Sequence, residues 1–586
     1  MERPDYNGVK FWSLFDWAFG SNYELAIDKL NSNQDLSGLS DINEIIELYE
    51  IYQIITCKGL KEEYSKPYLE KAKSLIPVVA RFFKTLNDEN LESYYSSVCV
   101  HYIEGFWDLF EKFSCFNSVS KETMQKFLMR DDVALYFPKS LLAKEYEGIL
   151  QKYIDSEHPN AGVLQLIWQS QSSAECPISD QLRLNAKRRS REVFSTLSGV
   201  TTSFGIGVSI APIKGLIEVE NKGNNDILYK YNLEYLEGRL DYKCIIENFS
   251  TIFAFTDTLG RSRFPSISSR LGVFERTYGV KGAKEYKTGS AFHVEELRSA
   301  ATMQAYYHFL KDNGIYIEDV ISWFFSEYLN DNYGIAGCSF NASSENSGFA
   351  ERCKNISSEM ESILKQYKMY VNTGSIDREL FEIASSAITL RTLPSQVTNK
   401  YAYVSSDRLK QELFLLFSDQ TLLAYLPDHK EYSCFAELAE TERIKLEDYK
   451  PHEKASLDYL ISRQTIYTDS TGYITLNHKR VFLLKDLYDN DVLCLKYFGD
   501  HQEIIDDLIA NKDIEIESML FTRPESDYLN YMLNKSTFSN GLDLRNRYAH
   551  GTYSKDENVQ AQDYISLLKI MIMVLLKIKE EFEIKR

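Results

Sequence analysis

The apolar segment near the end of the chain, "DYISLLKIMIMVLLKIKEEFEIKR", most constrains how this chain can fold. Its apolar run from Tyr564 to Ile578 carries two lysines, Lys569 and Lys577. A membrane-spanning helix needs about twenty largely uncharged apolar residues, so this run is too short and too charged to cross a bilayer. We therefore expect a helix buried in a bundle or at a dimer contact, and no membrane partner.

The length of 586 residues exceeds what one ordinary core can hold and predicts about three or four folding units. Changes of pattern along the chain place three regions: a helical domain at 1–195, a mixed α and β domain at 196–390 and a helical domain at 391–586. The expected fold class is therefore mainly α and multidomain.

Hydrophobic periodicity supports these three regions. Apolar residues at intervals of three and four predict helices in "LSDINEIIELYEIYQIITCKGL" and "KPYLEKAKSLIPVVARFFKTL" of the first region. The second region opens with "FSTLSGVTTSFGIGVSIAPIKGLIEVE", whose composition indicates short strands and turns. Helical spacing returns in "VEELRSAATMQAYYHFLKDNG" and "AERCKNISSEMESILKQYKMYV", with the polar loop "GCSFNASSENSGF" between them. In the third region, Thr471 to Leu476 indicates a hairpin beside helices, weakly similar to a winged-helix arrangement.

The net charge of −19 argues against a protein that coats nucleic acid through bulk electrostatics, so any nucleic-acid site must be local. One basic cluster stands out in the segment "LRLNAKRRSREVF", which contains Lys187, Arg188, Arg189 and Arg191. A solvated helix face is the simpler interpretation of this cluster, and a secondary contact with RNA is the functional one.

Cysteine usage indicates the compartment. The nine cysteines are scattered, odd in number and never spaced as CxxC, which is typical of reduced thiols and unlike a structural zinc site. The N-terminal sequence "MERPDYNGVKFWSLFDWAFG" has Glu2, Asp5 and Asp16 where a signal peptide would carry basic and uninterrupted apolar segments. We therefore expect a cytoplasmic protein with no metal site.

The stretch "LRNRYAHG" is the strongest candidate for chemistry in the chain. We expect a short helix at 542–550, with Asn540 or Asp543 as N-terminal cap and Gly551 in the left-handed position that ends the helix. His550 would then lie at a helix C-terminus, where the macrodipole favours the protonated imidazole.

The spacing of this stretch suggests how its polar groups act together. Asn546 lies four residues before His550, on the same helical face, and can orient the ring or hold a substrate oxygen. Arg545 is offset around the helix, but its long side chain can reach the same cleft. A planar guanidinium beside a titratable imidazole suits a phosphodiester. A long helix at about 559–581 can cover the apolar side of this short helix.

The motif "RNRYAHG" resembles the HEPN superfamily, which is defined by an Arg followed at a short interval by a His, and more narrowly a family with the pattern RNxxxHG. The resemblance covers residues 496–586. It implies a helical bundle that forms a homodimer through the C-terminal domain, with two motifs facing each other. Many relatives are metal-independent endoribonucleases of toxin–antitoxin systems, abortive phage defence or RNA processing.

Carried over by position, the resemblance makes Arg545 and His550 catalytic and makes Asn546 a supporting polar residue. Arg547, beside them, is a weaker candidate for RNA binding. The implied reaction is attack of a ribose 2′-hydroxyl on the adjacent phosphate, without metal or cofactor. The regions 1–195 and 196–390 would then sense a trigger, such as a phage-derived molecule, or restrain the nuclease, as an antitoxin would. The alternative is a non-catalytic HEPN module for dimerisation or for binding a partner protein.

Overall fold

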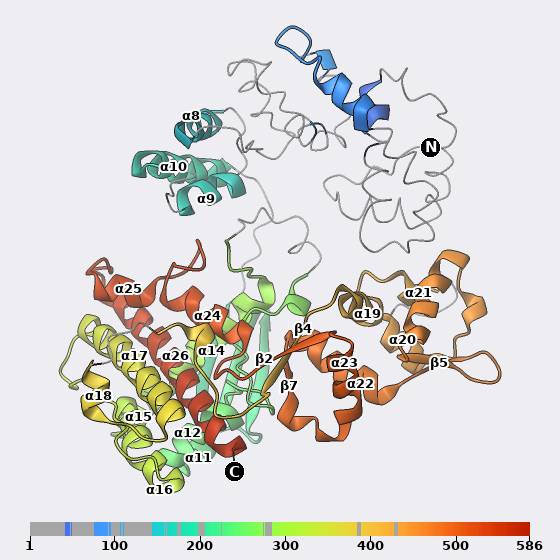
Figure 1. Ribbon diagram of the computed structural model, residues 1–586. Coiled ribbons are helices and arrows are strands. Elements are labelled where there is room, and N and C mark those ends of the chain that lie inside the picture. The colour runs from blue at the N-terminus through green and yellow to red at the C-terminus, as the bar shows by residue number, and fades with distance from the viewer. Residues whose placement is uncertain are drawn as a thin grey trace. The chain divides into compact units, whose positions relative to one another are not determined.

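The computed structural model describes most of the chain beyond residue 142 and short parts before it. The described residues are 41–46, 49, 76–91, 93, 94, 106, 109, 143–156, 159, 161–170, 172, 177–196, 205–223, 225–272, 275, 284–383, 388–426 and 432–585. They are mostly helical with small sheets, which confirms the expected mainly-α class with a mixed middle region. The chain divides into two compact units, residues 1–199 with 277–282 and residues 200–276 with 283–586 (Figure 1).

In the first unit, three helices share a small core. They are α8 (Ala143–Ile154), α9 (Ala161–Gln169) and α10 (Asp180–Thr196). Leu150, Leu164 and Leu182 are among the buried side chains that join them. Of the two helices expected nearer the N-terminus, the structure describes helical turns at 42–46 and 76–83, and the rest of both lies outside the described residues.

The second unit begins with a three-stranded sheet. Its strands are β1 (Ile206–Ala211), β2 (Ile217–Gly223) and β3 (Asp226–Asn232). The spatial order is β1-β3-β2, with β1 parallel and β2 antiparallel to the central strand. This confirms the short strands expected at the start of the second region.

A large helical core makes up most of the second unit. Its principal helices are α14 (Ser290–Asp312), α17 (Phe349–Thr373), α24 (Arg523–Leu533) and α26 (Glu557–Ile584). Shorter helices complete it: α11 (Leu233–Glu237), α12 (Tyr242–Thr251), α15 (Ile317–Trp323), α16 (Leu329–Tyr333) and α18 (Arg378–Ile383). Both long helices expected between 294 and 371 are confirmed as α14 and α17, with the polar loop between α16 and α17.

The core draws its buried side chains from two distant parts of the sequence, 231–393 and 520–582. Helix α26 packs against both α14 and α17, and these helices lie side by side in Figure 1. The expected boundaries at 195/196 and 390/391 remain predictions. The helix that follows the RNxxxHG motif nevertheless depends on residues before 390 for its packing.

Residues 400–517 form a second lobe around a core of their own. Its helices are α19 (Asp407–Phe417), α20 (Phe435–Thr441), α21 (Pro451–Ser462), α22 (His478–Asn490) and α23 (Gln502–Ala510). The short strands β4 (Tyr401–Val404), β7 (Leu493–Cys494) and β8 (Ile514–Glu517) form an antiparallel sheet in the order β7-β4-β8. The expected hairpin is confirmed as β5 (Ile466–Thr468) and β6 (Ile474–Leu476).

Helix α26 is apolar on nearly every side, and the core surrounds it accordingly. By length and composition it could cross a membrane, but 72% of its most apolar window is buried inside the protein. Asp556 caps its first turn by accepting a hydrogen bond from the Asn558 N–H. The expected buried helix is therefore present, with its two lysines inside the core.

The buried lysines of α26 are paired with carboxylates of α14, α24 and α26 itself. The Lys569 ammonium lies 2.5 Å from Glu296 of α14. Lys577 lies 2.8 Å from Glu580 and 3.4 Å from Glu525 of α24, and also donates to the Tyr401 hydroxyl of β4 at 2.9 Å. Burial alone lowers the pKa of Lys577, but the neighbouring carboxylates, Glu525 above all, outweigh burial and raise it. The lysine therefore stays charged inside the core.

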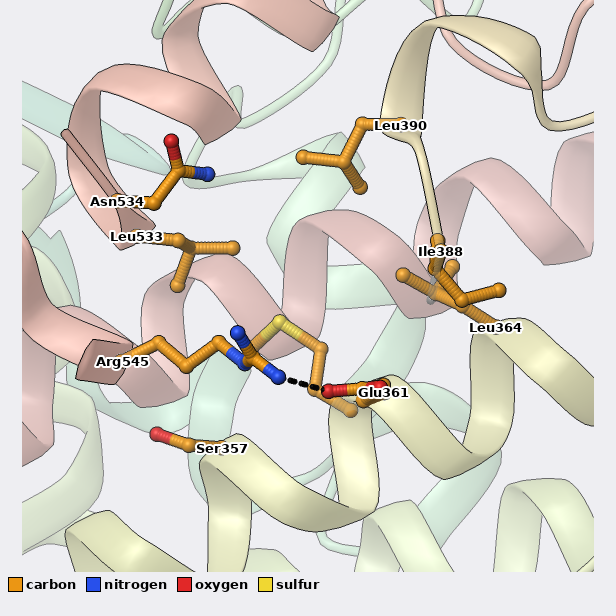
Figure 2. A pocket seen from close by; sticks show the side chains of 9 residues that line it. Ser357, Glu361, Leu364, Ile388, Leu390, Leu533, Asn534 and Arg545 are labelled. Atoms are coloured by element: carbon orange, nitrogen blue, oxygen red, sulfur yellow. Dashed lines mark hydrogen bonds and ion pairs between the residues drawn. The ribbon is translucent and has the colours of Figure 1, made fainter. Parts of the chain in front are cut away.

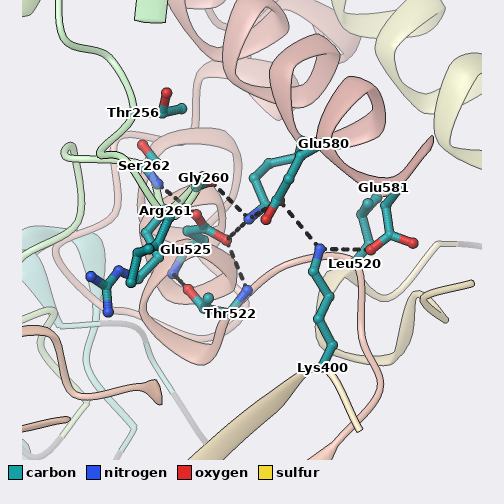
Figure 3. Close-up of polar contacts among 12 residues, drawn as sticks. Thr256, Gly260, Arg261, Ser262, Lys400, Leu520, Thr522, Glu525, Glu580 and Glu581 are labelled. Carbon is teal, nitrogen blue, oxygen red and sulfur yellow. Dashed lines mark hydrogen bonds and ion pairs between the residues drawn. The ribbon is translucent and has the colours of Figure 1, made fainter. Parts of the chain in front are cut away.

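Lys577 and the carboxylates around it form a buried charge cluster, and Lys400 adds a second ammonium to that cluster (Figure 3). Lys400, which precedes β4, lies 2.6 Å from Glu581 and 3.2 Å from Glu580. Glu525 accepts from the backbone N–H groups of Ser262 and Thr522, so it also caps α24. The cluster thus joins α26, α24 and the second lobe at one place.

Replacing Lys577 by alanine should strongly destabilise this unit. The substitution leaves buried carboxylates without their partner, which costs about 3–5 kcal/mol. Lys579→Ala is the matched control, because Lys579 lies on the same helix but pairs with the more exposed Glu583, and its loss should cost less than about 1 kcal/mol. Urea unfolding followed by circular dichroism measures both, and equal midpoints for the two variants would contradict the role given to Lys577.

Candidate functional site

The RNxxxHG motif lies on α25 (Leu544–Ala549) and the turn that follows it. The preceding loop is docked on α24, where the Leu542 N–H donates to the Tyr531 carbonyl at 2.7 Å. Gly541 is required there, because a Cβ at this position would lie 2.5 Å from the Asn534 carbonyl oxygen. The loop that leads into α25 is thereby fixed to α24 and the core.

The expected capping of this helix is wrong in part. Asp543 occupies the N-cap position, but with φ of 59° and without a side-chain bond to the helix backbone. Its carboxylate instead accepts from the Asn546 side-chain amide at 2.8 Å. Asn540 faces another segment, since it exchanges hydrogen bonds with the backbone of Tyr286. In both cases a hydrogen bond to another group takes the place of the expected cap.

The end of the helix agrees with the sequence. The His550 N–H donates to the Asn546 carbonyl at 2.9 Å, and the Thr552 N–H donates to the Arg547 carbonyl at 2.9 Å. Gly551 has φ of 74°, the left-handed conformation expected at this position. His550 therefore lies at the C-terminus of α25 and is exposed to solvent.

One side of α25 is anchored by Asp563 of α26. Its carboxylate accepts from the Tyr548 hydroxyl at 2.9 Å and pairs with Arg547 at 3.2 Å. Leu544 and Tyr548 are buried beneath the helix. Burial, together with nearby Cys353 and Asp563, raises the pKa of Tyr548, so its hydroxyl remains a donor. Arg547, a candidate RNA contact, is therefore largely committed to structure.

The other side of α25 presents the remaining motif residues. Arg545 pairs with Glu361 of α17, and its guanidinium also lies 3.4 Å from the Asn546 side-chain oxygen. Among the residues described, no hydrogen bond joins Asn546 to the His550 ring, because its amide is taken by Asp543 and Arg545. The structure thus brings Arg545 and Asn546 together, while His550 points to solvent at the end of the same helix.

Arg545 also lines a cavity of about 100 Å³ between α25, α24, α17 and the segment around residue 390 (Figure 2). Its wall is mostly apolar, and Asn546 and His550 are not part of it. The lining residues are Ser357, Met360, Glu361, Leu364, Ile388, Leu390, Leu533, Asn534 and Arg545.

Glu361 is the site residue that sequence reasoning missed. Partial burial raises the pKa of its carboxyl, but Lys365 and Arg545 outweigh burial and lower the pKa overall. Glu361 is therefore ionised at neutral pH and occupies the guanidinium of Arg545. It lies 184 residues before Arg545, so no local spacing could have indicated the contact.

The basic cluster of the first unit is only partly free for ligands. On α10, Arg189 pairs with Glu192 at 3.2 Å and donates to the Ser156 carbonyl. Lys187 lies over the Trp168 ring at 5.1 Å. Arg188 and Arg191 are exposed. Both interpretations of this cluster, a solvated face and an RNA contact, therefore remain open for these two arginines.

No cluster of three or more His, Cys, Asp or Glu side chains among the described residues could hold a metal ion. Comparison of the chain with protein-family models, with curated proteins and with solved structures finds no match. The likeness to the HEPN superfamily consequently rests on the motif and its surroundings in this chain.

Asp563→Ala should loosen α25 without unfolding the core. The change removes the acceptor of Tyr548 and the partner of Arg547, so amide hydrogen exchange at 544–550 should rise about tenfold. Glu557→Ala is the control, an exposed acid in the first turn of the same helix. Unchanged exchange at 544–550 in Asp563→Ala would show that Asp563 does not hold the motif in place.

Proposed function

We propose that this protein is a metal-independent endoribonuclease of the HEPN type, with Arg545 and His550 as catalytic residues and Asn546 as a supporting one. The observation that carries the proposal is the arrangement of α25. One side of this short helix is anchored by Asp563, while the other presents a guanidinium and an exposed imidazole. Catalysis by proximity and orientation requires reactive groups that are held in a fixed geometry.

The proposed reaction needs only these groups and the RNA. The 2′-oxygen of a ribose attacks the adjacent phosphorus, the bond from phosphorus to the 5′-oxygen breaks, and a 2′,3′-cyclic phosphate and a 5′-hydroxyl result. His550 accepts the proton of the 2′-hydroxyl, and the leaving 5′-oxygen takes up a proton from water or from the second motif of a homodimer. Arg545 stabilises the charge that develops on the phosphoryl oxygens.

The proposed biological setting is a regulated toxin or an anti-phage effector in the cytoplasm. In this proposal the first unit senses a trigger or binds an antitoxin. The core shared between 231–393 and 520–582 supports assigning the middle region to the same folded unit as the motif. Restraint by the middle region would therefore act within that unit, and removing all residues before 391 would expose the face of α26 that α14 and α17 cover.

One observation favours the second candidate, a non-catalytic module for dimerisation or for a partner protein. Arg545 and Asn546 both have intramolecular partners, Glu361 and Asp543, so the motif could serve structure alone. An arginine and a polar residue at a helix surface often have this role. The two candidates differ in what His550 does.

His550→Ala should abolish RNA cleavage. The wild type is expected to cleave a mixed RNA pool in EDTA and to leave 2′,3′-cyclic phosphate ends. Loss of a group that transfers a proton lowers the rate by about 10²–10⁴-fold. Cleavage is followed on gels, with end groups identified by mass spectrometry.

His478→Ala is the matched control, because His478 is an exposed histidine of the second lobe, far along the chain from the motif. It should cleave like the wild type. Both variants are first checked for unchanged melting and oligomeric state. Equal cleavage by the wild type and His550→Ala would remove the catalytic assignment and leave the non-catalytic module.

A further inference from the structure

The proposed cleavage reaction assigns no role to the cavity beside Arg545. Met360, Leu364, Leu390 and Leu533 are nearly fully buried around it, and Ile388 lies partly buried at its side. The cavity is smaller than the usual site for a whole small molecule, so it can take only one apolar part of a ligand. The cavity therefore offers a compartment next to the guanidinium that the proposed mechanism assigns to phosphate.

Charge is confined to one edge of this cavity. Figure 2 shows the Arg545 guanidinium and the Glu361 carboxylate meeting there, with uncharged side chains, most of them apolar, around the rest of the cavity. The side chain of Arg545 is 44% exposed and that of Glu361 is 25% exposed. An ion pair so open to solvent is weak, so a competing anion can displace the carboxylate.

The polar groups elsewhere in the lining have partners within the protein. The Asn534 side chain binds Asn530 and Ser536, and the Ser357 hydroxyl donates to the Cys353 carbonyl. What they can still offer a ligand is the second N–H of the Asn534 amide and the acceptor lone pairs of the Ser357 hydroxyl. Apolar side chains make up most of the lining, and Arg545 is the cation in it that can recognise an anion.

We propose that this cavity is a subsite for one unpaired nucleotide of the RNA, whose base enters the apolar compartment while its phosphate takes the place of Glu361 on Arg545. In the protein without RNA, the Glu361 carboxylate occupies the position on Arg545 that this phosphate would take. This inference rests on the proposed ribonuclease function and adds the kind of RNA that the site takes.

The geometry favours single-stranded RNA for a simple reason. A base in a duplex is stacked and covered by its partner, so it cannot enter a compartment between helices, whereas an unpaired base can be splayed out. A guanidinium holds a phosphate through paired, charge-assisted hydrogen bonds, which a carboxylate imitates. The base and phosphate of a nucleotide are joined through one ribose, and Arg545 lines the cavity here.

The test measures binding, not cleavage. The probe is a short fluorescein-labelled RNA of mixed sequence with every 2′-oxygen methylated, used as a single strand and as a duplex with the full-length protein. Glu361→Gln removes the competing carboxylate and should tighten binding of the single strand about fivefold. Glu351→Gln removes the same charge from an exposed position of the same helix and should bind like the wild type.

A second variant tests the cavity independently of charge. Ile388→Trp should place an indole in the compartment and weaken binding of the single strand about tenfold, as expected for the loss of one buried base. Leu422→Trp is its control, because Leu422 is 55% exposed in the second lobe. All variants are compared with the wild type for melting temperature before binding is measured by fluorescence anisotropy.

The subsite is supported if Glu361→Gln binds the single strand more tightly, Ile388→Trp binds it more weakly, and the duplex binds poorly to all. Equal affinity of Glu361→Gln and Glu351→Gln, or of Ile388→Trp and the wild type, overturns it. Cleavage that depends on His550 without these differences rejects the subsite alone. These differences in a protein that cleaves no RNA reject the catalytic proposal alone.

Discussion

The pairing of buried ammonium groups on α26 with carboxylates from other elements is the constraint on which the rest of the structure depends. Lys569 and Lys577 lie in the largely apolar part of α26, from Tyr564 to Ile578, and would be unstable in the core without partners. Glu296 of α14 and Glu525 of α24 supply them. A slide or rotation of α26 by one residue would separate Lys569 from Glu296 and Lys577 from Glu525, whereas the Lys577–Glu580 pair lies within α26. The ion pairs therefore set the register of the helix as well as its place.

The register of α26 determines the position of the candidate site through Asp563. This residue lies between one and two turns before Lys569 on the same helix and holds Tyr548 and Arg547 of α25. The motif helix is thus positioned by the same element that organises the core. The middle region takes part in this arrangement, because α14 and α17 cover α26 and α17 carries Glu361. The candidate site is therefore built from α17, α25 and α26, which all belong to the second unit.

The long helices could be predicted from sequence because their periodicity extends over many turns, as in α14, α17 and α26. Gly551 was also predictable, since a left-handed residue after a helix strongly favours glycine. The strands β4, β7 and β8 were not, because runs of two to four residues are too short to show an alternating pattern. The contact of Glu361 with Arg545 could not be predicted for another reason, because only tertiary packing brings α17 to the motif.

The measurement that tests the central claim most directly uses one RNA strand with a mapped cleavage position. The same strand is prepared with a single 2′-deoxyribose on the 5′ side of the scissile phosphate, and both are incubated with the wild type. If Arg545 and His550 act as proposed, the all-ribose strand is cut and the substituted strand stays intact at that bond, because the attacking hydroxyl is missing. Cutting of both strands at the same bond would contradict the account, since the attacking group would then have to come from elsewhere.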